Sequence, residues 1–394
     1  MALSSSSSSS SRPAHTIPIS QRPPPTLFQR AHLVLFNASF LVIILVLHAF
    51  QLCSIPSRRG KRMAKEAFGS VLVAIVALFG PSKLVMTVQE DDGPGGVKLE
   101  DLVVRDGRGK VVRLRLDREA VLVSNHQMYA DWIYPWIAMS YAGVANGLVI
   151  VLKASLEWAP LVGFAMQLFR FCFINNTTKL LDKSNLVPVA REAKRRGEPY
   201  QCLLFPEGTL YSVLTRPKSK AYAEKVGIPD TTHVLLPRAT GLFHTLTALS
   251  SAPGAPFPSL TLYDLTIGYA GVPAQGYAQD YYRLQTLFGY RVPPPTVHLH
   301  VRRARAAHDV PLDDRAEFDQ WLRQRWDDKD RLMAHFGEHG RFEGAQGVRD
   351  ERAELDIRLR AVDFARMGVC VATVFVTVRA LWWAWSAVRS VKGA

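Results

Sequence analysis

The 394-residue sequence predicts an α/β fold, in which a mixed sheet is covered by helices and flanked by N-terminal membrane helices and a C-terminal membrane-associated helix. Three observations support this class. Short, wholly apolar runs of the kind found in buried strands recur between residues 97 and 342, and helix-like stretches separate several of them. Longer apolar runs lie outside that range, at 31–52 and 367–388. The formal net charge is +14, which suits contact with an anionic membrane surface.

The N-terminal part is expected to lie in a membrane after a disordered leader. Residues 1–30 are rich in Ser and Pro and have too few apolar side chains to fold. The run 31–52 is long enough to span a bilayer and fits a signal anchor. Five basic residues follow between 58 and 65, which predicts that this loop is cytosolic. The shorter run 68–79 fits a re-entrant or interfacial helix as well as a second crossing, and 31–88 is assigned to membrane segments.

Residues 97–342 are expected to form one folded domain, which the motifs described below mark as the site of any chemistry. Seven runs are predicted to be strands: 120–123, 148–152, 171–174, 202–205, 234–236, 260–269 and 297–301.

The C-terminal residues 343–394 are expected to hold a helix and a membrane segment. The run 367–388 contains three Trp residues, which suit the headgroup level of a bilayer, but also Arg379, which must reach water or a partner. A tilted span, a helix lying on the surface and a buried helix of the domain all remain open.

Several other classes of site are not supported. The four cysteines are widely spaced, contain no C-x-x-C pair and are expected to be reduced thiols. No zinc-binding spacing, RNA-recognition signature or basic region with heptads is present, so a nucleic-acid partner is not expected. The acidic residues near the C-terminal end of the domain are interpreted as a solvated surface rather than a metal site: Asp313, Asp314, Asp327, Asp328 and Asp330.

A histidine and an aspartate, His126 and Asp131, follow the predicted strand 120–123. On a regular helix, residues five apart point about 140° away from one another, so their side chains could not meet. A strand–loop–helix turn would fold the carboxylate back on the imidazole, keep one ring nitrogen protonated and leave the other free as a base. The alternative is a core histidine with ordinary hydrogen bonds.

A second motif, Phe205-Pro206-Glu207-Gly208-Thr209, follows the strand 202–205. The proline ends the strand, and the glycine permits a tight turn that exposes backbone N–H groups. Glu207 would then be placed to accept a hydrogen bond from a glycerol backbone or to pair with a cation. A plain strand-to-loop turn is the alternative.

Together the two motifs resemble those of the glycerolipid acyltransferase family, the 1-acylglycerol-3-phosphate acyltransferases, from Val121 to about Phe342. The resemblance implies that His126 is the catalytic base and that Asp131 orients it. It also implies a substrate-binding set made of Glu207, Gly208, Thr209, Arg216, Lys218 and Lys153.

Three segments narrow the resemblance to one branch: 125–132, 262–269 and 298–302. They are similar to the lysocardiolipin and lysophosphatidylinositol acyltransferases, and their combination is most like the fungal phosphatidylinositol-remodelling members.

One position departs from the family pattern. The family's second block usually ends in Phe-Ile-x-Arg, whereas this chain has Asn176 in place of the arginine. An asparagine carries no charge and cannot replace a bidentate guanidinium on a phosphate. We therefore expect that Lys179, Arg216 or Lys218 binds the acceptor phosphate, or that the acceptor head group differs.

The resemblance implies an O-acyltransferase that uses acyl-CoA as co-substrate, without a metal or other cofactor, and esterifies lysophosphatidylinositol, lysocardiolipin or lysophosphatidate. An endoplasmic reticulum membrane with the catalytic domain facing the cytosol is expected, with mitochondrial and lipid-droplet membranes as alternatives. A transacylase of the same fold that takes its acyl group from a phospholipid is a competing function, and a non-catalytic membrane scaffold is another.

Overall fold

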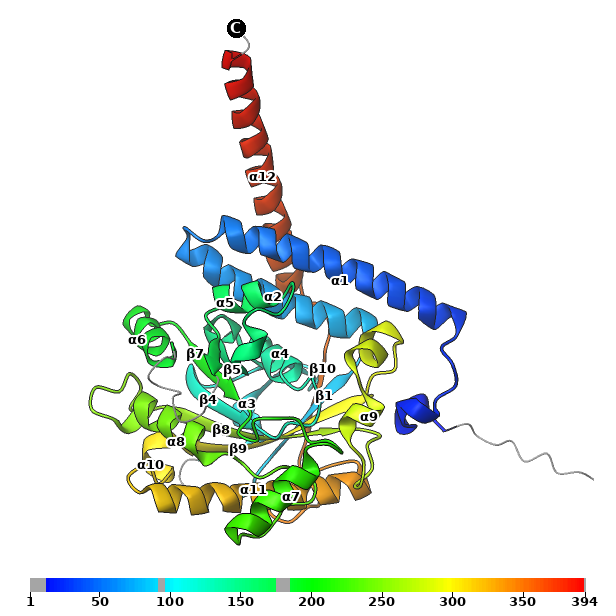
Figure 1. Ribbon diagram of the computed structural model, residues 1–394, viewed down its shortest axis with the longest axis vertical. Coiled ribbons are helices and arrows are strands. Elements are labelled where there is room, and N and C mark those ends of the chain that lie inside the picture. Colours follow the sequence, from blue (N-terminus) through cyan, green and yellow to red (C-terminus); the bar gives the residue numbers. More distant parts are fainter. Residues whose placement is uncertain (1–11, 91–95, 175–184, 393–394) are drawn as a thin grey trace, which may run out of the picture.

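The computed structural model describes residues 12–90, 96–174 and 185–392, and its centre is one eight-stranded sheet (Figure 1). The strand order is β10-β1-β9-β8-β4-β7-β5-β6. The strands are β1 Lys83–Val88, β4 Glu119–Ser124, β5 Leu148–Lys153, β6 Cys172–Ile174, β7 Tyr200–Leu204, β8 Thr261–Tyr269, β9 Thr296–Arg305 and β10 Ala353–Asp356. A separate hairpin pairs β2 Val103–Arg105 with β3 Val111–Leu114.

The sheet is mixed, as expected. The strands β8, β4, β7, β5 and β6 are all parallel, whereas β9 runs antiparallel to β8, and β10 antiparallel to β1. The carboxyl ends of β4, β7 and β5 therefore meet at one edge, which we call the carboxyl edge. Loops that follow these strands begin side by side, although they are far apart in the sequence.

Six of the seven predicted strands are confirmed, and the seventh, 234–236, is wrong. Its backbone groups bond to side chains instead of to a neighbouring strand. The amides of Thr232, His233 and Val234 donate to Asp330 Oδ1 over 2.8, 2.5 and 3.1 Å. The amide of Leu236 donates to Ser219 Oγ over 3.1 Å. An apolar run predicts burial, but it does not say which partner satisfies the backbone.

Two strands of the sheet lie outside the range 97–342 expected for the catalytic domain. β1 precedes that range and pairs in parallel with β9, and β10 follows it and pairs with β1. The run at 83–88 had been counted with the membrane segments, and the segment 353–356 has too few apolar residues to signal a strand.

Helices cover both faces of the sheet. The helices are α1 Leu27–Cys53, α2 Arg58–Phe79, α3 Leu99–Leu102, α4 Ile133–Ala142, α5 Gly163–Leu168, α6 Leu186–Arg196, α7 Arg216–Val226, α8 Ala239–Leu246, α9 Ala278–Tyr281, α10 Ala306–Asp309, α11 Arg315–His339 and α12 Ala361–Lys392. Side chains of β4 alternate between the two cores: Ala120 and Leu122 pack with α2 and α4, and Val121 and Val123 pack with α6, α8 and α11.

Two helices, α1 and α12, are long and apolar enough to cross a membrane. The expected membrane run 68–79 behaves differently, because it forms the second half of α2 and its residues 69–76 are buried against other elements. Most of this run is therefore packed inside the protein, and α2 is not one of the two helices long and apolar enough to cross a membrane.

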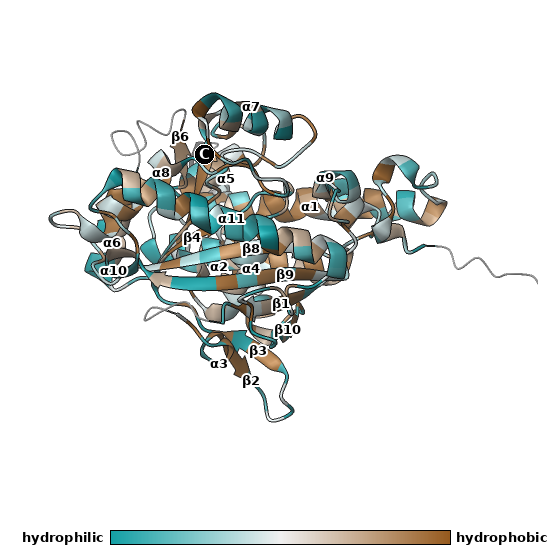
Figure 2. Ribbon diagram, turned by 90° about the horizontal axis from the view of Figure 1, so that it is seen from below, coloured by the Kyte–Doolittle hydropathy of each residue, from teal (hydrophilic) through white to brown (hydrophobic). Residues whose placement is uncertain are grey.

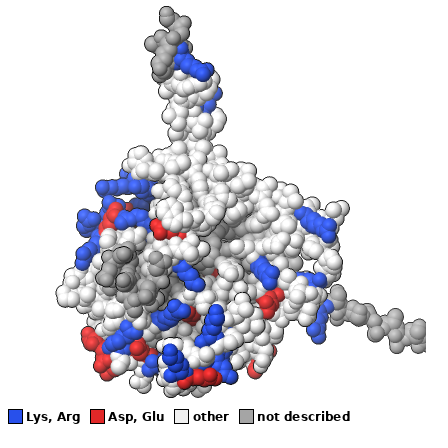
Figure 3. All heavy atoms as spheres, viewed as in Figure 1, with Lys and Arg blue, Asp and Glu red and all other residues white. Residues whose placement is uncertain are grey.

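α12 rises away from the body at one end, which excludes the alternative of a buried helix (Figure 1). Its first turn is held by Asp363, which accepts hydrogen bonds from Ser70 Oγ at 2.7 Å and from Arg360. The surface around its base carries few charged side chains on the face seen in Figure 3. At the opposite end, α7 and α11 are largely hydrophilic (Figure 2).

α1 lies along the body, and both of its ends are attached to it. Near its start, Gln29 Nε2 donates to Tyr290 O, and His32 Nδ1 lies 2.8 Å from Gly289 O. Near its end, His48 contacts the carbonyl of Leu161, and Gln51 Nε2 donates to Ala165 O. α1 therefore lies along the domain surface, and it is one of the two helices that could cross a membrane.

The leader is not disordered throughout, as had been expected for 1–30; residues 1–11 lie outside the described residues. Two short 3-10 helices, Ala14–Thr16 and Ile19–Gln21, precede α1. Arg22 Nη2 donates to Tyr281 O over 2.7 Å, and Tyr282 Oη donates to the carbonyl of His15. These long-range contacts order a segment whose composition alone suggests disorder.

Candidate functional site

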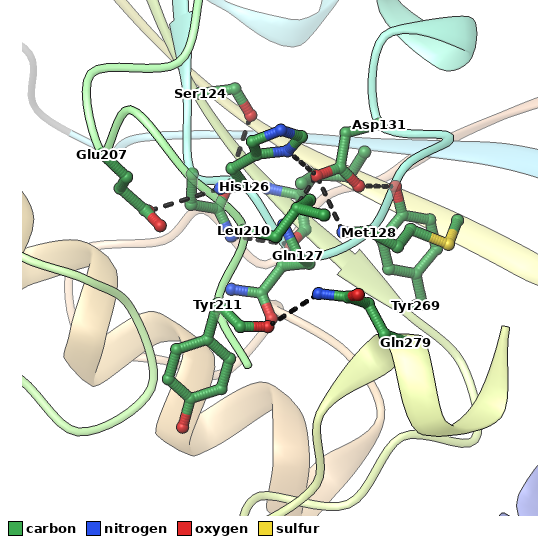
Figure 4. A network of polar contacts seen from close by, with 12 residues as sticks. Ser124, His126, Gln127, Met128, Asp131, Glu207, Leu210, Tyr211, Tyr269 and Gln279 are labelled. Atoms are coloured by element: carbon green, nitrogen blue, oxygen red, sulfur yellow. Dashed lines mark hydrogen bonds and ion pairs between the residues drawn. The ribbon is translucent and has the colours of Figure 1, made fainter. Parts of the chain in front are cut away.

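His126 and Asp131 meet directly after β4 (Figure 4). The imidazole Nδ1 lies 2.7 Å from Asp131 Oδ2, the carboxylate is fully buried, and the histidine side chain is 20% exposed. Regular helix begins only at Ile133, so residues 125–132 form the turn that the five-residue spacing requires. The predicted contact is confirmed, and the roles of the two residues are taken up below.

Asp131 accepts three further hydrogen bonds that fix its orientation. The amides of Gln127 and Met128 donate to Oδ2 over 2.6 and 3.0 Å, and Tyr269 Oη donates to Oδ1 over 2.5 Å. Burial raises the pKa of Tyr269 well above its ordinary value, so the hydroxyl keeps its proton and remains a donor. Because Oδ2 faces Nδ1, the network assigns the ring proton to Nδ1 and leaves Nε2 as an acceptor.

The loop carrying the histidine is held from two further sides. The ring of Phe205, at the end of β7, stacks on the imidazole with centroids 4.3 Å apart. The side-chain amide of Asn125 donates to Ile267 O over 3.0 Å and accepts from Ile267 N over 2.8 Å, which attaches the loop to β8. The imidazole is therefore held in place by β7 and β8 as well as by Asp131.

Glu207 lies beneath this loop rather than facing solvent, since only 2% of it is exposed. Its Oε1 accepts from His126 N at 3.3 Å and from Trp326 Nε1 at 3.4 Å, and the backbone of Leu235 also donates to it. The pKa of Glu207 is raised well above 4.5, chiefly because burial removes the carboxylate from water. Within the described residues it pairs with no cation, and its visible contacts support the His126 loop.

Gly208 occupies the left-handed region with a φ of +69°, which a residue with a side chain adopts only with strain. Its amide donates to Phe205 O over 2.9 Å and closes the turn. The expectation that this N–H is exposed for a ligand is therefore wrong. Thr209 follows it in a partly exposed position.

The cations named from the sequence are not gathered at the turn. Arg216 begins α7 and makes a bidentate ion pair with Asp230, over 3.3 and 2.6 Å, so its charge is already compensated. Lys218 is exposed on the first turn of α7, and Lys153 is exposed at the end of β5. Asn176 and Lys179 lie outside the described residues.

Arg238 was missed by sequence reasoning as a site residue. A Cβ placed on Gly208 would lie 3.2 Å from both Cδ and Nε of this arginine, so its guanidinium arm lies against the Glu-Gly-Thr turn. The side chain is exposed and makes no ion pair with any residue that the structure describes.

The acidic residues set aside as a solvated surface have structural partners. Asp330 caps the backbone of 232–234, Asp328 pairs with Arg302 over 2.9 Å, and Asp314 caps α11. In the described part of the chain, no three His, Cys, Asp or Glu side chains are grouped so that they could hold a metal ion.

Comparison with known proteins identifies the family. The family model described as "Acyltransferase" matches residues 107–267, which include the dyad and the Glu-Gly-Thr turn, and "Acyltransferase C-terminus" matches 290–361.

Curated relatives agree with that match. An uncharacterized acyltransferase of Schizosaccharomyces pombe is 33% identical over 71% of this chain and 75% of its own length. The 2-acyl-1-lysophosphatidylinositol acyltransferase of Saccharomyces cerevisiae is 31% identical over 72% and 76%. Lysocardiolipin acyltransferase 1 of Danio rerio is 31% identical over 56% and 53%. The chain thus belongs to the acyltransferase family and is an acyltransferase.

Proposed function

We propose that this acyltransferase moves a fatty acyl group from acyl-CoA to a free hydroxyl of a lysophospholipid, with His126 as general base. One observation carries the mechanism: Nδ1 of a partly exposed imidazole lies 2.7 Å from a fully buried carboxylate, which leaves Nε2 free to accept a proton. The names of the relatives support the acceptor class, since two of them are called lysophosphatidylinositol and lysocardiolipin acyltransferases.

The proposed step is a direct transfer. Nε2 of His126 takes the proton of the acceptor hydroxyl as its oxygen attacks the thioester carbonyl carbon. The tetrahedral intermediate then collapses, the C–S bond breaks, and the coenzyme A sulfur leaves and takes the proton from the imidazolium. Asp131 stabilises the transient positive charge on the ring. No metal or other cofactor is needed in this proposal.

For the acceptor phosphate we propose Arg238 as the principal contact, with Lys153 and Lys218 as further candidates. Arg238 is an unpaired cation among the described residues and lies against Gly208. A guanidinium can bind phosphate through two parallel hydrogen bonds. Arg216 remains a weaker candidate, because its ion pair with Asp230 would have to break first.

We propose that the protein works at a membrane of the endoplasmic reticulum with its active site in the cytosol. The two apolar helices α1 and α12 support the membrane association.

The test uses the full-length chain purified in detergent and returned to vesicles. Labelled acyl-CoA is offered with lysophosphatidylinositol, lysocardiolipin or lysophosphatidate, and labelled phospholipid replaces acyl-CoA in a parallel series. We expect product from acyl-CoA with at least one lysophospholipid and none with His126→Ala. Product from the phospholipid donor alone would identify a transacylase, and no product with any pair would contradict the proposal.

A further inference from the structure

The loop after β5 presents apolar side chains to the exterior. It covers residues 154–168, from the 3-10 turn Ala154–Leu156 to the end of α5, and we call it the apolar lip. Trp158 is 79% exposed and Leu161 is 53% exposed. The other exposed apolar side chains of the lip are Leu156, Val162 and Phe164. So many large apolar groups on one short segment mark a surface that another apolar phase covers.

The backbone of the lip is held in an unusual conformation. Leu161 has a φ of +66°, which is rare for a residue with a Cβ. The adjacent amide of Val162 donates to Pro160 O over 2.8 Å and closes a tight turn. Conformations of this kind persist where the surrounding structure enforces them, and they are common at functional sites.

The lip is continuous with the outer face of α1. His48 contacts the carbonyl of Leu161, its ring lies 6.2 Å from that of Phe164, and Gln51 donates to Ala165 O. The outer face of α1 is itself apolar and exposed, at Leu27, Phe28, Val34, Leu35, Leu41, Val42, Leu45 and Leu52. Because both ends of α1 are attached to the body, this face cannot turn inward, and the lip extends it as a single apolar surface.

The surroundings identify a lipid bilayer as the phase that covers this surface. α12, the other helix apolar enough for a membrane, rises from the same end of the molecule (Figure 1). On the face shown in Figure 3, few charged side chains appear between the two ends of α1 and at the base of α12, whereas Lys and Arg side chains flank this apolar zone at both ends. A soluble partner protein would not explain why the apolar surface joins two membrane-type helices.

The lip also belongs to the carboxyl edge, where His126 lies. In the order β4-β7-β5-β6, the histidine follows β4 and the lip connects β5 to β6. Phe205 follows β7, and Leu152 and Phe173 are register partners near the carboxyl ends of β5 and β6; all three are partly buried against the same apolar core. Apolar side chains therefore stand at the ends of the strands between the lip and the imidazole, and Phe205 stacks on the imidazole itself.

We infer that the apolar lip inserts into the bilayer beside α1, and that Phe173, Leu152 and Phe205 guide acyl chains from the lipid phase to His126. The insertion follows from the exposed surface alone, and the guiding role rests on the proposed lysophospholipid activity. The lip thereby sets the depth at which the carboxyl edge meets the membrane, and lipid substrates reach the dyad without leaving an apolar environment.

The first experiment measures insertion without any substrate. An environment-sensitive NBD fluorophore is attached to Trp158→Cys in the full-length chain carrying Cys53→Ser, because Cys53 is the partly exposed native thiol among the described cysteines. The matched control is Tyr222→Cys on α7, another exposed aromatic position (56%) at the end opposite α12. Vesicles of phosphatidylcholine and phosphatidylinositol should shift the emission to the blue at 158 only, and spin-labelled lipid should quench that position only.

The second experiment separates insertion from catalysis. Trp158→Glu should raise the KM for a long-chain lysophospholipid embedded in vesicles roughly tenfold, the scale of one large apolar contact. It should leave turnover of a water-soluble short-chain lysophospholipid unchanged, and Tyr222→Glu should change neither. Equal NBD spectra at 158 and 222 would overturn the insertion, whatever the activity. A blue shift at 158 with equal KM changes for both acceptors would overturn the guiding role alone.

Discussion

Two carboxylates lie at the carboxyl edge, Asp131 after β4 and Glu207 after β7, and their surroundings differ sharply. Asp131 faces an imidazole nitrogen, two backbone amides and the hydroxyl of Tyr269, all within 3.0 Å. Glu207 is equally buried, but its hydrogen bonds from His126 N and Trp326 Nε1 are longer, 3.3 and 3.4 Å, and burial raises its pKa.

This difference separates an orienting residue from a supporting one. The short hydrogen bonds around Asp131 suit an ionised carboxylate that stabilises a charged imidazole. The desolvated position of Glu207 favours its protonated form, in which it supports the backbone of the His126 loop. The four predictions below test this contrast and the phosphate contact proposed beside it.

The largest expected effect follows His126→Ala. We expect turnover to fall roughly 10²- to 10⁴-fold, because the general base is lost. The partly exposed ring contributes little to stability, so thermal unfolding and vesicle binding should remain close to wild type. Turnover of the purified variant in vesicles measures this, and near-normal turnover would remove His126 from the mechanism.

Asp131→Asn should lose nearly as much activity, about 10²- to 10⁴-fold, because an amide at this position can donate to the imidazole and favour the wrong tautomer. Tyr269→Phe, which removes only the hydroxyl to Oδ1, should cost less and serves as a graded control. The pair of variants is compared by turnover at saturating acceptor. Full activity in Asp131→Asn together with loss in His126→Ala would show that the contact has no orienting role.

Arg238→Ala should raise the acceptor KM roughly tenfold and change kcat much less, since a phosphate contact is shared by the ground and transition states. Arg216→Ala is the matched control, because its guanidinium is already paired with Asp230. Its effect on KM should be small. A larger increase in KM for Arg216→Ala than for Arg238→Ala would identify Arg216 as the phosphate contact instead.

Glu207→Gln should have the smallest effect, because glutamine resembles the protonated carboxyl in shape. Since folding raises the pKa of Glu207 above 4.5, the folded state binds more protons than the unfolded state over that interval. The stability contributed by this group is full below that value and declines as the pH rises through the folded pKa.

Glutamine cannot titrate. The difference in unfolding temperature, Glu207→Gln minus wild type, should therefore become more positive as the pH rises from about 5 to about 8. Differential scanning fluorimetry in detergent measures this difference, with Glu224→Gln, on the exposed face of α7, as control. A difference that stays constant with pH would mean that Glu207 is ionised in the folded protein.

The elements and contacts that depend on nearby residues could be predicted from the sequence. Apolar runs located β4, β5, β6, β7, β8 and β9, because a buried strand needs apolar side chains on both faces. The contact of His126 with Asp131 followed from five residues of local chain after one of these strands. The same reasoning failed at 234–236, where side chains, chiefly that of Asp330, satisfy the backbone in place of a strand.

The mixed α/β class, the His126–Asp131 contact and the apolar helices α1 and α12 could all be inferred from residues close together in the chain. Which distant groups complete them depends on how the elements pack in three dimensions. Tyr269 reaches Asp131 from 138 positions away, and Arg238 lies against Gly208 because the segment leading into α8 returns to the carboxyl edge. The attachment of α1 at both ends likewise depends on contacts more than a hundred residues apart. The order in which strands and helices pack sets such long-range contacts, and no local pattern of residues records that order.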